Sequence, residues 1–102
     1  QKRMIMEQDE ITRRNVAIAE YMYPNLVYDD HVGACHEYHC SWEWLMPVVE
    51  KIAAARSEAF HHGPSYKGGW FARFGMDKNA IGSTMIKAAW LAVSEYVLSL
   101  KS

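Results

Sequence analysis

The sequence predicts a small α+β domain, and two observations indicate this fold class. Three segments, at about 9–22, 42–56 and 84–100, carry apolar residues at helical spacing. A fourth segment, 69–75, alternates in side-chain character between bounding glycines, which is typical of a strand. We therefore expect a mainly antiparallel sheet of about two to four strands packed with three helices. The length predicts a single domain over residues 1–102.

The first predicted helix spans residues 9–22. Its inward stripe contains one polar residue among apolar ones: Ile11, Asn15, Ile18, Ala19 and Met22. Asp9 is a candidate N-cap, because a carboxylate there can accept a hydrogen bond from a free backbone N–H. Pro24 follows the last residue of the stripe and is expected to stop the helix.

The second predicted helix spans residues 42–56. Its expected buried stripe is Trp42, Leu45, Met46, Val49, Ile52 and Ala53. Ser41 is expected to cap the helix through its hydroxyl. Pro47 removes one backbone hydrogen bond, so either the helix bends there or a separate turn precedes a regular helix that starts near Met46. We favour one bent helix.

The third predicted helix begins at Ser83 or Thr84 and runs to residue 100. Gly82 marks its entry. Its stripe covers four turns and comprises Ile86, Ala89, Trp90, Val93, Val97 and Leu100.

The clearest strand is 69–75, in which Trp70, Ala72 and Phe74 share one face. Two further candidates are 25–30 and 58–62. The second of these is expected to pair with 69–75 as a hairpin, through the turn-rich residues between them.

Composition and charge argue against several classes of protein. The formal net charge is −1, which gives no strong nucleic-acid or membrane signal. No apolar run approaches the roughly 20 residues of a membrane span, and the polar start lacks a secretory signal. Position 1 is not Met, so we expect the chain to be trimmed at its start. Two cysteines form no disulfide framework, which favours a reduced, cytoplasmic protein.

Potential metal ligands gather before the second helix: His31, Cys35, His36, His39 and Cys40. Zinc sites usually combine two close ligand pairs, and a second pair is missing unless His61 and His62 fold back. We therefore expect no metal and no cofactor, with His36, His39 and Cys40 as the fallback ligand set. The simpler interpretation makes the cysteines small buried apolar residues and lets the histidines cover the helix start. A Cys35–Cys40 disulfide is disfavoured in a reducing compartment, and no third partner for Cys–His catalysis is evident.

The loop from Phe60 to Gly75 is the candidate ligand-binding segment. Glycines permit close approach of a ligand to the backbone, and aromatic rings beside cations suit nucleobase stacking and phosphate contact. The expected binding residues are Tyr66, Lys67, Trp70, Arg73 and His61, together with His39. An ordinary hairpin with a solvated surface is the simpler alternative.

The tryptophans are expected to lie mostly in the core. Trp42 and Trp44 cannot both point inwards on one helix, since two residues rotate a side chain by about 200°. We expect Trp44 to be the exposed one and to lie in an interface, which favours a homo-oligomer.

A resemblance is carried by "YHCSWEWLMPVVEKI", residues 38–52. This stretch resembles the Y-H-x-S-W-D-W-L-M-P-V-V-E-K-I motif of small uncharacterised proteins of gut-bacterial phages and prophages. The segments "NVAIAEYM" and "MIKAAWLAVSEYV" resemble further helices of the same group. The resemblance implies a compact domain of the phage ABA-sandwich type, acting in the cytoplasm of the host cell, and supplies no catalytic residues. The motif is matched by Tyr38, His39, Ser41, Trp42, Trp44 and Pro47, whereas Cys35 and Cys40 lie outside it.

The expected function is therefore that of a non-enzymatic phage accessory protein. It would act by stoichiometric binding of a host factor, or of a signalling nucleotide as an oligomeric sponge, to counter host defence. One alternative is a zinc-binding or Cys/His-dependent small enzyme centred on His36, His39 and Cys40. The other is a structural or assembly protein.

Overall fold

The computed structural model describes residues 2–24 and 37–100, which form an α+β domain with a three-stranded antiparallel sheet. The predicted fold class is confirmed. In chain order the elements are α1 (Lys2–Met22), α3 (Trp42–Arg56), β1 (Phe60–Pro64), β2 (Trp70–Phe74), β3 (Ala80–Gly82) and α4 (Met85–Ser99).

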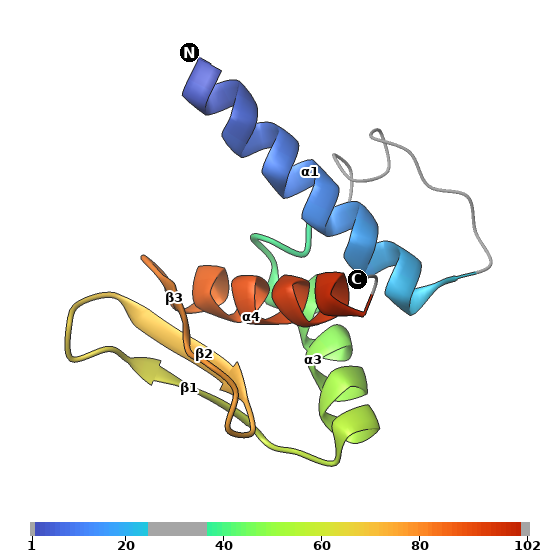
Figure 1. Ribbon diagram of the computed structural model, residues 1–102, viewed down its shortest axis with the longest axis vertical. Coiled ribbons are helices and arrows are strands. Elements are labelled where there is room, and N and C mark those ends of the chain that lie inside the picture. Colours follow the sequence, from blue (N-terminus) through green and yellow to red (C-terminus); the bar gives the residue numbers. More distant parts are fainter. Residues whose placement is uncertain (1, 25–36, 101–102) are drawn as a thin grey trace.

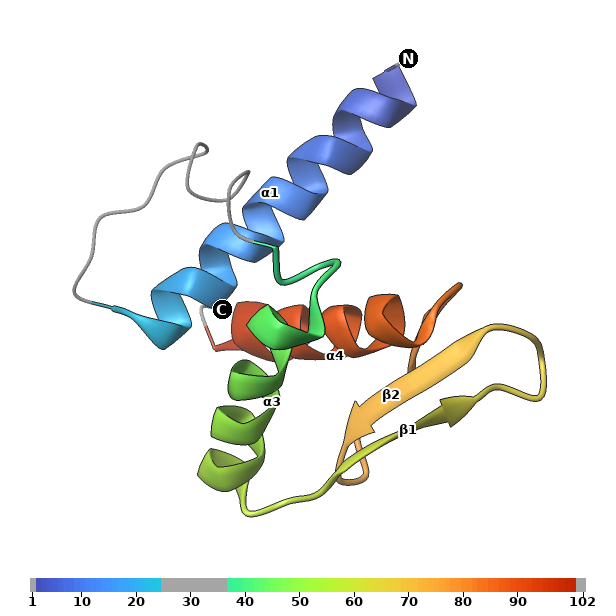
Figure 2. The ribbon, with the colours of Figure 1, turned by 180° about the vertical axis from the view of Figure 1, so that it is seen from behind.

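Helix α4 is the centre of the domain, because it packs against α1, α3 and all three strands. Figures 1 and 2 show α1 on one side of α4 and the sheet on the other. Coverage from both sides buries a wide face of this helix, in agreement with the predicted stripe except at Ile86, which is partly buried, and at Leu100, the exposed C-cap. The buried residues are Ala88, Ala89, Trp90, Ala92, Val93, Ser94 and Val97.

Helix α1 begins at Lys2, so the predicted N-cap at Asp9 is wrong and Asp9 lies inside the helix. Residues 2–8 consist mainly of strong helix formers, and this propensity extends the helix beyond the apolar stripe. The predicted end is confirmed at Met22, just before Pro24. Figure 1 shows the early part of α1 extending beyond the rest of the domain.

Helix α3 is one continuous helix with Pro47 inside it. Ser41 occupies the predicted N-cap position, but its hydroxyl makes no capping hydrogen bond. The predicted stripe is wrong at Trp42 and Met46, which are both exposed. Trp42 is the first residue of the helix, and Met46 is rotated by about 100° from its buried neighbour Leu45. The residues that α3 buries are Leu45, Val48, Val49 and Ile52.

The start of α4 agrees with the sequence analysis. Thr84 is the N-cap, and its side-chain oxygen accepts a hydrogen bond from the backbone N–H of Lys87 at 3.2 Å. Gly82 permits the close approach of β3 to this helix, since a Cβ there would lie 2.6 Å from the backbone nitrogen of Ala88.

The strands follow the order β1-β2-β3. Phe60 pairs with Phe74 and Pro64 with Trp70, which confirms the predicted hairpin with β1 two residues later than expected. Ala72 and Phe74 are buried and Trp70 is partly buried, as the alternation predicts. Strand β3 is absent from the prediction because three residues are too short to show a period. The candidate strand at 25–30 lies outside the described residues.

No helix that the structure describes is both long and apolar enough to cross a membrane.

Candidate functional site

The structure distributes the predicted ligand-binding residues over different parts of the molecule. Tyr66 and Lys67 lie in the turn of the β1–β2 hairpin, and Trp70 begins β2. His61 lies on β1 opposite Arg73 in the strand register. His39 lies apart from these residues in the turn before α3, where it lines a cavity that none of the others lines.

Arg73 is held by its own neighbourhood. Its Nε donates to the carbonyl oxygen of Gly75 at 3.0 Å, and its Nη1 donates to Oδ1 of Asn79 at 3.0 Å. The guanidinium also lies 5.7 Å from the ring centroid of Phe71. These contacts direct Arg73 towards the β2–β3 turn.

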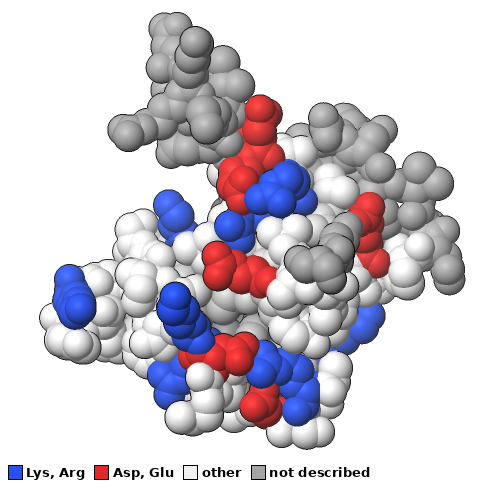
Figure 3. Space-filling model, in the orientation of Figure 1, with Lys and Arg blue, Asp and Glu red and all other residues white. Residues whose placement is uncertain are grey.

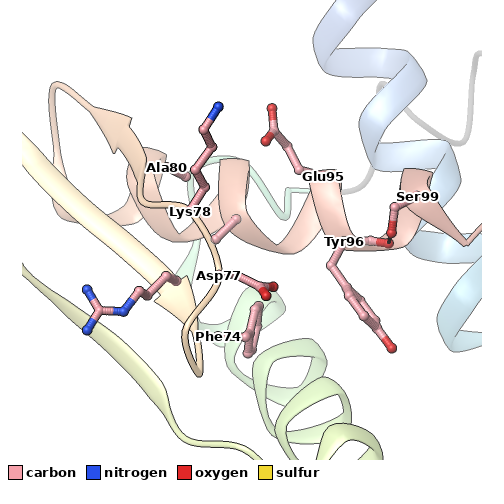
Figure 4. Close-up of a pocket in the computed structure, with 9 residues that line it drawn as sticks. Phe74, Asp77, Lys78, Ala80, Glu95, Tyr96 and Ser99 are labelled. Atoms are coloured by element: carbon pink, nitrogen blue, oxygen red, sulfur yellow. Dashed lines mark hydrogen bonds between the residues drawn. The ribbon is translucent and has the colours of Figure 1, made fainter.

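Arg73 also borders a cavity of about 230 Å³ between the sheet and α4. Asp77 and Lys78 enter this cavity from the β2–β3 turn, and Glu95 and Tyr96 enter it from α4. Figure 4 shows the carboxylate of Asp77 between Phe74 and Tyr96 in this view.

Asp77 is already neutralised from outside this cavity. The Arg56 guanidinium forms two hydrogen bonds with its carboxylate, which lowers the pKa of Asp77. Arg56 also pairs with Glu58 at 2.5 Å and lies 5.3 Å from the ring centroid of Tyr96. This arrangement fastens the end of α3 to the β2–β3 turn, which is a structural role.

The tip of the β1–β2 hairpin carries an isolated aromatic residue and a cation. Tyr66 is 95% exposed, and the Nζ of Lys67 lies 5.9 Å from its ring centroid. Gly68 and Gly69 have φ angles of +99° and +76°, a region that favours glycine. The tip therefore presents one open ring face and one ammonium group without an enclosing cavity.

Two exposed tryptophans lie at the start of α3, about 200° apart around the helix axis. Trp42 is 36% and Trp44 is 39% exposed, so the prediction that Trp44 is exposed is confirmed and a core position for Trp42 is wrong. The ring of Trp44 meets the buried ring of Tyr38 edge-on, with 5.5 Å between centroids. Trp44 also lines a cavity of about 310 Å³, together with Met22, Tyr23, Tyr38, Glu43 and Pro47.

A buried hydrogen-bond chain joins Trp90, Asn15 and His39. The Nε1 of Trp90 donates to Oδ1 of Asn15 at 2.8 Å, and Nδ2 of Asn15 lies 2.9 Å from Nδ1 of His39. An indole nitrogen can only donate, so Oδ1 of Asn15 is the acceptor and its amide nitrogen faces His39. That nitrogen donates, hence Nδ1 of His39 accepts. The neutral imidazole therefore carries its proton on Nε2.

Burial supports the neutral form of this histidine. It lowers the pKa of His39, and the nearby Glu37 carboxylate acts more weakly in the opposite direction. A proton on Nδ1 would also oppose the amide hydrogens of Asn15. His39 is thus a fixed donor through Nε2, with no described side chain or backbone group bonded to that nitrogen.

His39 lines the largest of the three cavities, whose volume is about 480 Å³. The walls come from α1, from the turn before α3 and from the first half of α4. They comprise Glu10, Ile11, Arg14, His39, Cys40, Thr84, Ile86, Lys87, Trp90 and Leu91.

The charge of Arg14 at this cavity is compensated. Its Nε pairs with Glu10 at 2.6 Å and its Nη2 lies 3.7 Å from a carboxylate oxygen of Glu95. Its Nη1 donates to the hydroxyl of Ser94 at 2.6 Å. On the face of the molecule seen in Figure 3, acidic and basic side chains are likewise interspersed over the described residues.

The described residues offer no group of three or more His, Cys, Asp or Glu side chains that could hold a metal. Of the fallback ligands, His39 bonds to Asn15 and Cys40 is a free, exposed cysteine. His31, Cys35 and His36 lie outside the described residues.

Asn15 and Trp90 were predicted to lie on the inward faces of their helices, but not as parts of a polar network. A signal was present, because an asparagine in the apolar stripe of a helix must find hydrogen-bond partners when it is buried. Its partners are distant in the chain and could not be identified without the fold. Comparisons of the chain with protein-family models, curated proteins and solved structures found no match, so the candidate sites rest on geometry and residue chemistry.

Proposed function

We propose that this chain is a non-enzymatic phage accessory protein that counters host defence by binding a host protein stoichiometrically. The observation that carries the binding role is the exposed Trp44 at the start of α3, beside a cavity of about 310 Å³. The phage context is supported by the sequence motif in the same segment. The proposed binding surface is the aromatic face, defined as Trp44, Tyr23, Glu43 and Pro47, which line the same cavity.

The aromatic face has the properties of an interface anchor. Trp44 stands on α3, and its contact with the buried Tyr38 restricts its ring. Binding of a partner would therefore restrict few additional side-chain rotations, which keeps the entropy cost of binding small. Tryptophan is enriched among residues that dominate protein–protein binding. The cavity of about 310 Å³ beside Trp44 can receive one protruding apolar side chain.

The charges around the aromatic face indicate the character of the partner. Glu37, Glu43 and Glu50 are exposed on or beside this end of α3. Lys51 is turned towards α1. Its Nζ donates to the backbone carbonyl oxygen of Tyr21 at 2.9 Å and lies 4.6 Å from the centroid of the Tyr21 ring. The complementary partner surface combines an apolar protrusion with a rim of Lys or Arg.

The proposal is tested by isolating complexes of this protein from extracts of the bacterial host and measuring their masses by native mass spectrometry. We expect a complex of fixed stoichiometry with a host protein, lost in Trp44→Ala and kept in Trp42→Ala, whose side chain lies on the other side of the helix. Met76→Ala is the matched control, because Met76 is 91% exposed and lies in the β2–β3 turn. The absence of a stoichiometric complex, or a complex that survives Trp44→Ala, would contradict the proposal.

A second candidate function is sequestration of a signalling nucleotide by a homo-oligomer. It is supported by the hairpin tip, where the open ring of Tyr66 and the ammonium of Lys67 could stack on a base and contact a phosphate. Because the tip encloses no cavity, a second copy would have to close the site.

Titration calorimetry against cyclic di- and trinucleotides and ADP-ribose derivatives, with light scattering, tests this candidate. Saturable binding that Tyr66→Ala abolishes would support it. No heat of binding from an oligomeric sample would eliminate it.

A further inference from the structure

The cavity of about 480 Å³ between α1 and α4 is separate in its lining from the aromatic face. Its volume lies in the usual range for small-molecule sites, roughly 300–1,000 Å³. Its walls combine apolar side chains with a few polar groups, which is the composition that such sites share. The aliphatic wall consists of Ile11, Ile86 and Leu91.

Trp90 forms part of the wall but offers little ring surface for stacking. It is only 4% exposed. The Arg14 guanidinium lies 5.8 Å from its ring centroid and the His39 ring lies 6.1 Å away. The cavity therefore favours an aliphatic or compact aromatic body over a stacked nucleobase.

The polar groups of the cavity favour a hydrogen-bond acceptor. The Trp90–Asn15–His39 chain leaves His39 with a donor at Nε2. The hydroxyl oxygen of Thr84 accepts from the backbone N–H of Lys87, so its hydrogen is available for donation. An acceptor in this cavity can thus meet donors from two different elements.

The charges of the cavity favour an anion. Arg14 is balanced by Glu10 and Glu95, whereas Lys87 is exposed and forms no ion pair with a described residue. Lys87 therefore supplies an uncompensated positive charge beside the donors. A carboxylate can accept from an ammonium, an imidazole and a hydroxyl group together.

We infer that this cavity binds a small carboxylate with an apolar body, held by Lys87 and His39 and packed against Ile11, Ile86 and Leu91. The site is independent of the aromatic face and can be tested whether or not a host protein binds there.

The test compares 4-phenylbutanoate with its neutral amide, 4-phenylbutanamide, by titration calorimetry. We expect saturable binding at one site and a preference of roughly tenfold for the carboxylate, which corresponds to one charge-assisted contact. Lys87→Gln should remove this preference. Lys78 is an exposed lysine at the cavity between the sheet and α4, and Lys78→Gln should retain the preference.

A second measurement locates the bound probe. Cys40 lines the cavity and is exposed, so in a Cys35→Ser background 4-phenylbutanoate should slow its alkylation by iodoacetamide. The inference is overturned by any of four results: no saturable binding, equal binding of acid and amide, equal effects of both lysine substitutions, or unchanged alkylation. Binding of AMP without binding of the carboxylate would also overturn it.

Discussion

At the scale of single residues, Asn15 has the most demanding position in the described structure. It is fully buried and connects the indole of Trp90 to the imidazole of His39. Replacing it with alanine leaves the indole N–H without its acceptor in the core. We expect Asn15→Ala to lower the free energy of unfolding by about 2–3 kcal/mol.

The control for this change is Asn79→Ala, which removes an exposed hydrogen bond to Arg73. Its effect should stay within about 0.5 kcal/mol. Urea denaturation of both variants measures the difference, and equal losses would show that Asn15 has no special structural role.

His39 gives stability a dependence on pH in the mildly acidic range. Burial lowers its pKa from 6.5, so the unfolded chain takes up the proton at a higher pH than the folded chain. The stabilisation that comes from the neutral His39 is therefore fully present above the pKa that this residue has in the unfolded chain. It is lost as the pH falls through the pKa of His39 in the folded chain. Arginine partners lower the pKa values of Glu10 and Asp77 from 4.5 and 3.8, so these groups titrate below this range.

We expect the free energy of unfolding to fall as the pH drops through the ordinary histidine pKa of 6.5, and to fall less in His39→Gln, which cannot titrate. Urea denaturation at each pH provides the measurement. Parallel pH profiles for the two proteins would assign the effect to other groups.

At the scale of secondary-structure elements, the two N-caps make a matched pair. Thr84 accepts a capping hydrogen bond from Lys87, whereas Ser41 occupies the same position of α3 without one. Thr84→Ala should therefore lower the free energy of unfolding by about 1 kcal/mol, and Ser41→Ala should lower it by less than about 0.5 kcal/mol. Chemical denaturation of both variants distinguishes them, and a larger loss for Ser41→Ala would contradict the described cap geometry.

The sequence predicted those elements whose signals are local. The apolar stripes of α1, α3 and α4 and the alternation of β2 repeat often enough to be recognised. Strand β3 is only three residues long and depends on pairing with β2, which no local pattern reveals. Trp42 shows the opposite problem, because its spacing fits the buried stripe of α3 but the fold leaves its side chain 36% exposed.

At the scale of the whole molecule, the candidate site was predictable only in part. The exposure of Trp44 followed from helix geometry, and His39 was named among the binding residues. The cavity around His39 could not be foreseen, because Glu10, His39 and Lys87 come together only when α1 and the turn before α3 pack beside α4. Sequence proximity grouped Tyr66 with Arg73, but the hairpin directs them to its tip and to the β2–β3 turn respectively.

The same whole-molecule view separates three surfaces that can be tested one at a time. The aromatic face lies at the start of α3, the largest cavity lies beside α1 and α4, and the hairpin tip lies at the turn of β1 and β2. A change confined to one surface should leave the other two intact, because their lining residues do not overlap.

The most direct test of the proposed binding role is photo-crosslinking in host cells with p-benzoylphenylalanine in place of Tyr23, which is 51% exposed beside Trp44, compared with position 66 at the hairpin tip. We expect one discrete adduct with a host protein from position 23 and none from position 66. No adduct from position 23, or the same adduct from both positions, would contradict a binding surface around Trp44.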